Sequence, residues 1–248
     1  MSIFLVNWKK QSQYFRIQKK NKFVFIHIPK MAGTSIKNAI EKSKFRDSFI
    51  YKGHSFPIHK LSKKENNYRI FSSVRNPLAW YVSLYNFKIN ADYINSPLKD
   101  YSIMPNNSFN DFFDDVVMMN NGIEGLMKWY KPYKKYNREL FNFENEQLGC
   151  LTLQFIYYCF EDWSEILKYK NIHSLIINNF KELISVDRVL KVENLQSDFN
   201  EMVSNTSIRI TFKKDNVTPH SPYMDMYSDY MVKSIRERDN CIFELFNY

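Results

Sequence analysis

The sequence predicts a three-layer α/β fold in which a central, mainly parallel sheet is flanked by helices. Segments 23–28 and 69–74 read as strands that are buried on both faces, because bulky residues run through them without a polar alternation. Turn and helix signals follow each segment directly, and strands that alternate with helices build parallel sheets covered on both faces. At 248 residues the chain is expected to form a single domain with a substantial core.

The first of these strands leads into a turn with the chemistry of an anion site. Residues 23–35 read FVFIHIPKMAGTS, and Pro29 ends the strand because it cannot donate to a sheet ladder. Lys30 lies in the turn, and residues 36–41 read as the opening of a helix. The N-terminus of a helix presents main-chain N–H groups and a positive dipole, to which Lys30 adds a full charge. The segment therefore predicts a cradle for a phosphate or a sulfate.

A second segment with a related order spans residues 69–87, RIFSSVRNPLAWYVSLYNF. Asn76 can cap a helix and Pro77 suits its first position, so a helix is expected to begin here. Arg75 then stands at the carboxyl end of a strand, which is where ligands bind in open α/β sheets. Ser83 lies about two turns into the following helix.

These two segments together resemble the sulfotransferase family. A Walker A loop has its lysine after the second glycine, whereas Lys30 precedes Gly33, as in the sulfotransferase 5′-phosphosulfate loop, whose usual form is close to PKTGGTS. Met31 and Ala32 depart from that form at positions where backbone amides are expected to bind. The resemblance implies that 3′-phosphoadenosine 5′-phosphosulfate (PAPS) is the sulfuryl donor. It implies that the 5′-phosphosulfate is bound by Lys30, Ala32, Gly33, Thr34 and Ser35.

The resemblance extends to the other end of the nucleotide and to the fold. Arg75 and Ser83 match the family's 3′-phosphate motif, with Asn76 in place of the usual Asp. The family has a P-loop-like fold, and residues 188–199 resemble its late strand, placed at 188–192, and the turn that follows. Residues 216–248 resemble its C-terminal segment.

A histidine between the two motifs resembles the base of glycan-modifying members, of the heparan sulfate 2-O-sulfotransferase type and their bacterial relatives. Residues 51–56 read YKGHSF, and histidine titrates near neutrality, as a general base for an alcohol should. His54 is therefore the candidate catalytic base, with Lys30 stabilising charge, and His59 is the rival. His27, inside the first strand, is expected in the core or behind the site. His173 and His220 are expected to be structural.

The implied reaction is a direct in-line transfer of the sulfuryl group to an acceptor hydroxyl, which leaves adenosine 3′,5′-bisphosphate. No metal is expected, because Lys30 and the loop amides can neutralise the leaving phosphate. A glycan is the favoured acceptor, while tyrosine and small phenols stay open. Residues 88–185, with helices expected near Phe109–Met119 and Leu148–Lys168, are expected to form a helical insertion that binds the acceptor.

Composition bears on partners and compartment. The net charge of +9 suits an anionic nucleotide and an acidic glycan, or reflects a generally lysine-rich surface. Residues 1–22 are expected to form an N-terminal arm, and its apolar run at 3–6 is too short for a signal peptide or a membrane span. Packing of this arm on the domain is favoured over peripheral contact with a membrane. Three cysteines at unrelated spacings suit a reducing compartment, so the enzyme is expected in the cytoplasm.

Two other classes of protein remain open on the sequence. A nucleotide-dependent small-molecule kinase would share the strand, loop and helix, but it should carry a Walker lysine and an acidic magnesium ligand. A non-catalytic protein that binds nucleic acid or glycan would also be basic and aromatic. The aromatic residues here fall mostly in apolar runs, as core residues do, so no nucleic-acid partner is expected. The oligomeric state is left open.

Overall fold

The computed structural model of the chain describes residues 22–54, 56–89, 108–118, 148–212 and 222–248. Contacts divide it into two compact units. The first contains the described residues of Met1–Val74, Tyr157–Asp162 and Asn178–Asn216. The second contains those of Arg75–Ile156, Trp163–Ile177 and Val217–Tyr248. The predicted arm lies outside the described residues except for Lys22, and the single-domain organisation stays a prediction.

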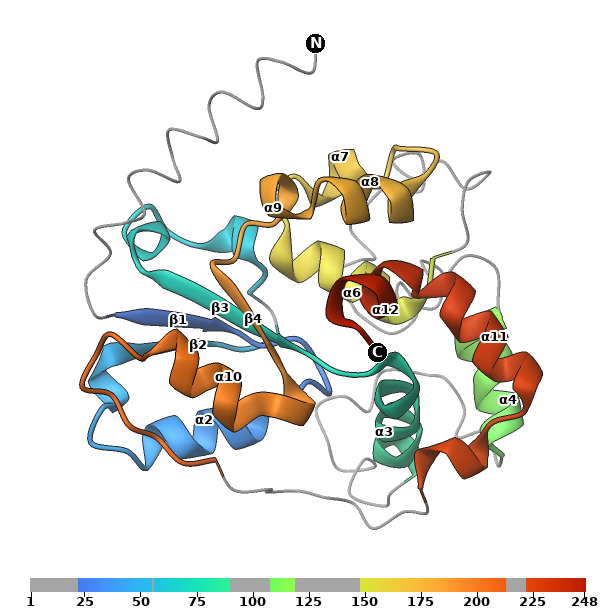
Figure 1. The fold of residues 1–248 in the computed structure, drawn as a ribbon, viewed down its shortest axis with the longest axis horizontal. Coiled ribbons are helices and arrows are strands. Elements are labelled where there is room, and N and C mark those ends of the chain that lie inside the picture. Colours follow the sequence, from blue (N-terminus) through green and yellow to red (C-terminus); the bar gives the residue numbers. More distant parts are fainter. Residues whose placement is uncertain (1–21, 55, 90–107, 119–147, 213–221) are drawn as a thin grey trace. The chain divides into compact units, whose positions relative to one another are not determined.

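The first unit is built on a four-stranded, fully parallel sheet with the order β2-β1-β3-β4 (Figure 1). The strands are β1 (Phe23–Ile26), β2 (Phe49–Lys52), β3 (Arg69–Val74) and β4 (Arg188–Lys191). The three strands expected from the sequence are therefore present, and the predicted α/β class is confirmed. The sequence prediction missed β2, although its run FIYK, followed by Gly53, is a short strand signal.

Helices connect the strands of the first unit and form most of the second. The first unit holds α2 (Gly33–Glu41), α9 (Phe180–Leu183), α10 (Leu195–Met202) and the end of α6 (Cys150–Cys159). The second holds α3 (Pro77–Ile89), α4 (Phe109–Phe113), most of α6, α7 (Trp163–Ile166), most of α8 (Ile172–Asn178), α11 (Asp229–Arg238) and α12 (Asn240–Phe246). None of the helices in these described ranges is long and apolar enough to cross a membrane.

Short helical turns fill several connections, and two expected helices differ from the prediction. The 3-10 turns are Arg46–Ser48, Ile58–Lys60, Glu65–Asn67, Val192–Asn194 and Tyr223–Met226. The helix expected near Phe109–Met119 is α4 followed by a π-helical turn at Asp114–Met118. The helix expected over Leu148–Lys168 is interrupted between α6 and α7, because Ser185 bonds the chain there: its N–H donates to the Cys159 carbonyl at 2.8 Å and its hydroxyl accepts from Glu161 N–H at 2.9 Å.

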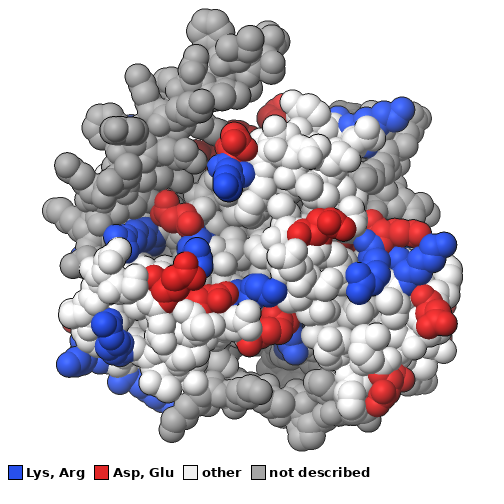
Figure 2. Space-filling model, viewed as in Figure 1, with Lys and Arg blue, Asp and Glu red and all other residues white. Residues whose placement is uncertain are grey.

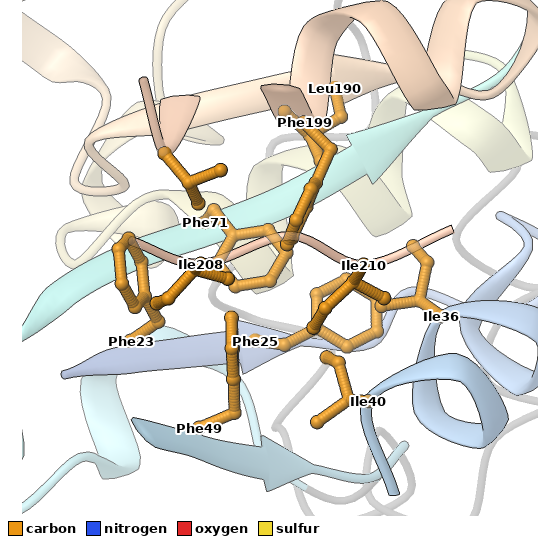
Figure 3. Packing of buried hydrophobic residues seen from close by; sticks show 11 residues of the cluster. Phe23, Phe25, Ile36, Ile40, Phe49, Phe71, Leu190, Phe199, Ile208 and Ile210 are labelled. Carbon is orange, nitrogen blue, oxygen red and sulfur yellow. The ribbon is translucent and has the colours of Figure 1, made fainter. Parts of the chain in front are cut away.

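One face of the sheet carries the main apolar core of the first unit. Aromatic side chains from three strands meet Ile36 and Ile40 of α2 and Phe199 of α10 (Figure 3). The rings of Phe25 and Phe71 stack with centroids 5.0 Å apart. Because α2 contributes two buried isoleucines on one side, its N-terminus is fixed against the end of β1. This packing positions the turn between β1 and α2.

The charged surface mixes both signs. On the face drawn in Figure 2, described Lys and Arg side chains lie among Asp and Glu side chains rather than in a patch of one sign. Arg188 pairs with Glu201, for example, and Lys52 pairs with Glu65 at 2.6 Å. On this face acidic side chains therefore offset part of the positive charge of the described Lys and Arg residues.

Candidate active site

The turn after β1 lies where the strand order reverses. β1 pairs with β2 on one side and with β3 on the other, so the carboxyl end of β1 is the topological switch point of this sheet. Ligands of open α/β proteins bind in the crevice outside the strand ends at such a point. The position of the predicted phosphosulfate cradle is thus one that the fold itself favours for a ligand.

The backbone of this turn has an unusual conformation. Lys30 and Ala32 both have left-handed backbone angles, with φ of 64° and 57°, although neither is glycine. Left-handed residues interspersed in a turn bring main-chain N–H groups to one side, and such concavities bind anions. Ala32 is also the N-cap residue of α2, and its side chain cannot cap the first N–H groups. These groups, from Gly33 to Ser35, can therefore serve a ligand.

Two serines at the end of β3 hold the β1 side of the turn. Ser73 donates from its hydroxyl to the Met31 carbonyl at 2.5 Å, and Ser72 donates to the Ile26 carbonyl at 2.9 Å. Both serines are fully buried, so these bonds replace lost contacts with water. The sequence prediction missed this role, and the only signal for it was a pair of hydroxyl residues inside a buried strand.

His54 is brought to the same edge of the sheet by β2. Since β1 and β2 are parallel neighbours, their carboxyl ends lie together, and His27 N–H extends the pairing by donating to the Lys52 carbonyl at 3.0 Å. His54 follows two residues later and is exposed. The hydroxyl of Tyr158 donates to the His54 carbonyl, which fixes the backbone of the base candidate.

The electrostatic surroundings keep the His54 imidazole neutral. Partial burial of the ring and the positive charge of Lys30 both lower its pKa below the ordinary 6.5. Lys30 therefore lies close enough to His54 to act on it. The structure brings Lys30, the residues Ala32 to Ser35 and His54 together in the first unit.

The other histidines lie in different settings. His27 is buried at 4% exposure directly after β1, as expected from the sequence. His59 packs edge-on against Tyr157, with ring centroids 5.4 Å apart, and burial lowers its pKa. His173 is buried in the second unit, where its Nδ1 accepts from Cys241 N–H at 3.2 Å. His220 lies outside the described residues.

Arg75 and Ser83 belong to the second unit. Asn76 caps α3 as predicted, because its side-chain oxygen accepts from Leu78 N–H at 2.9 Å. Pro77 is the first residue of that helix. Arg75 therefore follows β3 directly in the chain, and both Arg75 and Ser83 are partly exposed. Their role toward the nucleotide stays a prediction.

The residues of the β1–α2 turn fit the phosphosulfate end of PAPS. The turn offers main-chain donors at a helix N-terminus, two hydroxyls at Thr34 and Ser35, and the ammonium group of Lys30. Thr34 is exposed and Lys30 and Ser35 are partly exposed, whereas Gly33 is buried. Such groups match the oxygens and the charge of a phosphate or sulfate.

Comparison with known proteins agrees with this chemistry. A model of the sulfotransferase family matches residues 13–248, which is most of the chain. No curated protein and no solved structure matches. The family uses PAPS as the sulfuryl donor. The match assigns sulfotransferase activity in place of the kinase and non-catalytic alternatives. The chain therefore belongs to the sulfotransferase family and is a PAPS-dependent enzyme.

Proposed function

We propose that the enzyme transfers the sulfuryl group of PAPS to a hydroxyl group of a carbohydrate, with His54 as the general base and Lys30 as the stabiliser of the leaving phosphate. The observation that carries this proposal is the position of His54. The partly buried imidazole of His54, a residue that keeps exposed surface, lies beside a lysine-bearing anion cradle, at the edge of the sheet where both β1 and β2 end. A hydroxyl bound over the cradle would meet both groups.

The protonation state of His54 supports its role. Burial of the ring and the charge of Lys30 hold its pKa below the ordinary value, so the imidazole is neutral at pH 7. A neutral imidazole can accept the proton that the acceptor hydroxyl loses as it attacks. The Tyr158 hydroxyl, which donates to the His54 carbonyl, limits how far the base can move.

The residues that would hold PAPS divide between its two ends. Lys30 and the segment 32–35 would hold the 5′-phosphosulfate, and Arg75 with Ser83 would hold the 3′-phosphate. Bound PAPS supplies an activated sulfuryl group, whose bond to the 5′-phosphate oxygen breaks as its bond to the acceptor oxygen forms. Lys30 offsets the charge that develops on the departing oxygen, and His54 takes the proton.

A glycan hydroxyl is the acceptor class that we favour. The GH-type segment resembles the glycan-modifying branch, and Phe56, two residues after His54, leaves 44% of its surface exposed. An exposed ring beside the base offers an apolar surface to the face of a sugar. The ammonium group of Lys52 lies 4.9 Å from the centroid of this ring, which fixes one of its faces.

The test is a transfer assay with labelled PAPS and a panel of acceptors. We expect label to move to an oligosaccharide or polysaccharide from extracts of the source cell, and not to tyrosine peptides or small phenols. Transfer to a phenol in preference to every glycan would contradict the acceptor class while leaving the sulfotransferase activity intact.

We also propose that the enzyme works in the cytoplasm. Cys150, Cys159 and Cys241 are buried, and none is in a disulfide. Reduced, buried thiols suit a reducing compartment. Fractionation of the source cell with an antibody to the protein tests this, and recovery outside the cytoplasmic fraction would refute it.

A further inference from the structure

His27 occupies a central place between the cradle and the base candidate, and neither the family match nor the proposed reaction gives it a role. Its ring lies 4.0 Å from the ring of His54 and 5.6 Å from that of Tyr51, measured between centroids. The Nδ1 atom of His27 is hydrogen bonded to the Tyr51 hydroxyl. Strand β2, through Tyr51, and the loop after it, through His54, thus meet at one imidazole.

A third neighbour of His27 is Gly33, the first residue of α2. A Cβ atom built on Gly33 would lie 1.8 Å from Cδ2 and 1.9 Å from Nε2 of His27, far inside van der Waals contact. The edge of the imidazole therefore fills the space that a side chain at residue 33 would need. Gly33 has no positive φ, so alanine would suit its backbone, and the three atoms nearest to such a Cβ all belong to the His27 ring.

The His27–Tyr51 pair is uncharged in the working enzyme. Burial, together with the positive charges or dipoles of His54, Lys30 and Lys37, lowers the pKa of His27 to about 3. Burial and the charge of Glu41 raise the pKa of Tyr51 to about 12. Near neutral pH the tyrosine therefore keeps its proton and can donate it to His27 Nδ1, which leaves the Nε2 proton on the edge that faces Gly33.

We propose that His27 is a positioning residue that sets the spacing between the N-terminus of α2 and the segment that carries His54, with Tyr51 holding its ring in one orientation. The part that concerns His54 rests on the proposed function, in which His54 is the base. A neutral ring suits this buried place, because a cation here would be desolvated and would repel Lys30 and the positive end of the α2 dipole. Steric contact with Gly33 and ring contact with His54 transmit the position of His27 to both sides.

A double-mutant cycle on the full chain tests the contact with the cradle. Gly33→Ala should weaken the affinity for adenosine 3′,5′-bisphosphate roughly tenfold or more, because the new methyl group displaces the helix N-terminus. In His27→Ala/Gly33→Ala the space is free, so the affinity should recover to within a few-fold of that of His27→Ala. Gly53→Ala is the matched control, since a Cβ there meets its nearest atom at 3.7 Å and should leave the affinity unchanged.

Calorimetry with the bisphosphate needs neither an acceptor nor a base. The result of this cycle is therefore valid even if the His54→Ala variant shows that His54 is not the base. Losses that simply add in the double variant would overturn the proposal. Wild-type affinity in Gly33→Ala would do the same.

The first part of a second measurement uses only the wild-type protein, and its second part compares the Tyr51→Phe variant. Long-range ¹H–¹⁵N NMR should show His27 as one neutral tautomer with its proton on Nε2, unchanged between pH 5 and pH 8. In Tyr51→Phe the ring should populate both tautomers, and turnover should fall severalfold while bisphosphate affinity stays the same. A His27 signal that titrates near neutrality would refute the proposal, as would a Tyr51→Phe variant with the wild-type tautomer and rate.

Discussion

The hydroxyl of Ser73, at the end of β3, donates a 2.5 Å hydrogen bond to the carbonyl oxygen of Met31 in the turn after β1. This bond joins β3 to the turn after its neighbour β1, at the switch point of the sheet, and residues 30 and 32 of that turn are both left-handed. A turn of this kind persists only where its surroundings over-determine it. The conformation of the cradle therefore depends on contacts with β3 as well as on the residues of the turn itself.

Lys30→Ala is expected to reduce the rate of sulfuryl transfer by roughly 10²–10³, because it removes a charge that gains importance as the bridging oxygen departs. The melting temperature should change little, since the side chain is partly exposed in a turn. Lys42→Ala, at the exposed C-terminal end of α2, is the matched control and should keep the wild-type rate. A near wild-type rate in Lys30→Ala would show that the cradle is wrongly assigned.

Arg75→Lys is expected to weaken the binding of adenosine 3′,5′-bisphosphate by about tenfold, because lysine cannot reproduce two parallel N–H bonds to a phosphate. Ser83→Ala should weaken binding more mildly. Both variants should also discriminate less well against a nucleotide that lacks the 3′-phosphate. Calorimetry measures each affinity, and the exposed Arg46→Lys is the control. Unchanged affinity in Arg75→Lys would exclude it from the 3′-phosphate site.

His54→Ala is expected to cost roughly 10²–10⁴ in turnover and to leave bisphosphate affinity nearly intact. His59→Ala should cost much less, because the ring of His59 packs against Tyr157. A base must be neutral to act, so the wild-type rate should fall at acid pH with a midpoint below 6.5, the direction in which the pKa of His54 is shifted. If His59→Ala lowers turnover more than His54→Ala does, His59 is the general base and His54 is not.

Ala32→Gly is expected to stabilise the protein, by up to about 1 kcal/mol, because an alanine with φ of 57° bears a steric cost that glycine avoids. Bisphosphate affinity should be kept. The control is Ala39→Gly within α2, where glycine should instead destabilise by about 1 kcal/mol. Urea denaturation compares the two, and equal destabilisation would show that the turn bears no strain at residue 32.

Asp239, buried between α11 and α12, should make stability depend on pH. Its carboxylate accepts from the Tyr81 hydroxyl and from Thr152 N–H, both at 2.8 Å, but burial raises its pKa from 3.8 to about 6. The folded state therefore binds the carboxyl proton of Asp239 more tightly than the unfolded state does. This tighter binding adds to the free energy of unfolding, fully below about pH 4, and the added stability is lost as pH rises through 6. Calorimetric unfolding from pH 4 to 7 should show this fall.

In Asp239→Asn that pH-dependent component should disappear, at a cost of about 1–3 kcal/mol from the hydrogen bond that the amide group cannot accept. Asp225→Asn, at an exposed position, should retain the wild-type pH profile. Identical pH profiles for wild type and Asp239→Asn would show that Asp239 keeps its ordinary pKa in the fold.

The parts of the fold that were predicted correctly depend on signals within a few residues. The run Phe23–Ile26, the proline after it, and the pair Asn76 and Pro77 fix a strand, its end and a helix start through local backbone geometry. β2 was missed because four residues carry little periodicity. The interruption after Cys159 was missed because the bonds that cause it come from Ser185, 26 residues along the chain.

The sequence by itself determined the family, which the comparison confirms, and it predicted the groups of the candidate site: a lysine and hydroxyls at a strand-to-helix turn, and a histidine in a GH segment. Only the tertiary structure decided that His54 lies beside Lys30, that His27 fills the space at Gly33, and that both histidines are neutral. Residue types and turn geometry are set by near neighbours in the chain. Contacts between strand ends and shifts in pKa depend on burial and on charges from distant segments, which only the folded sheet brings together.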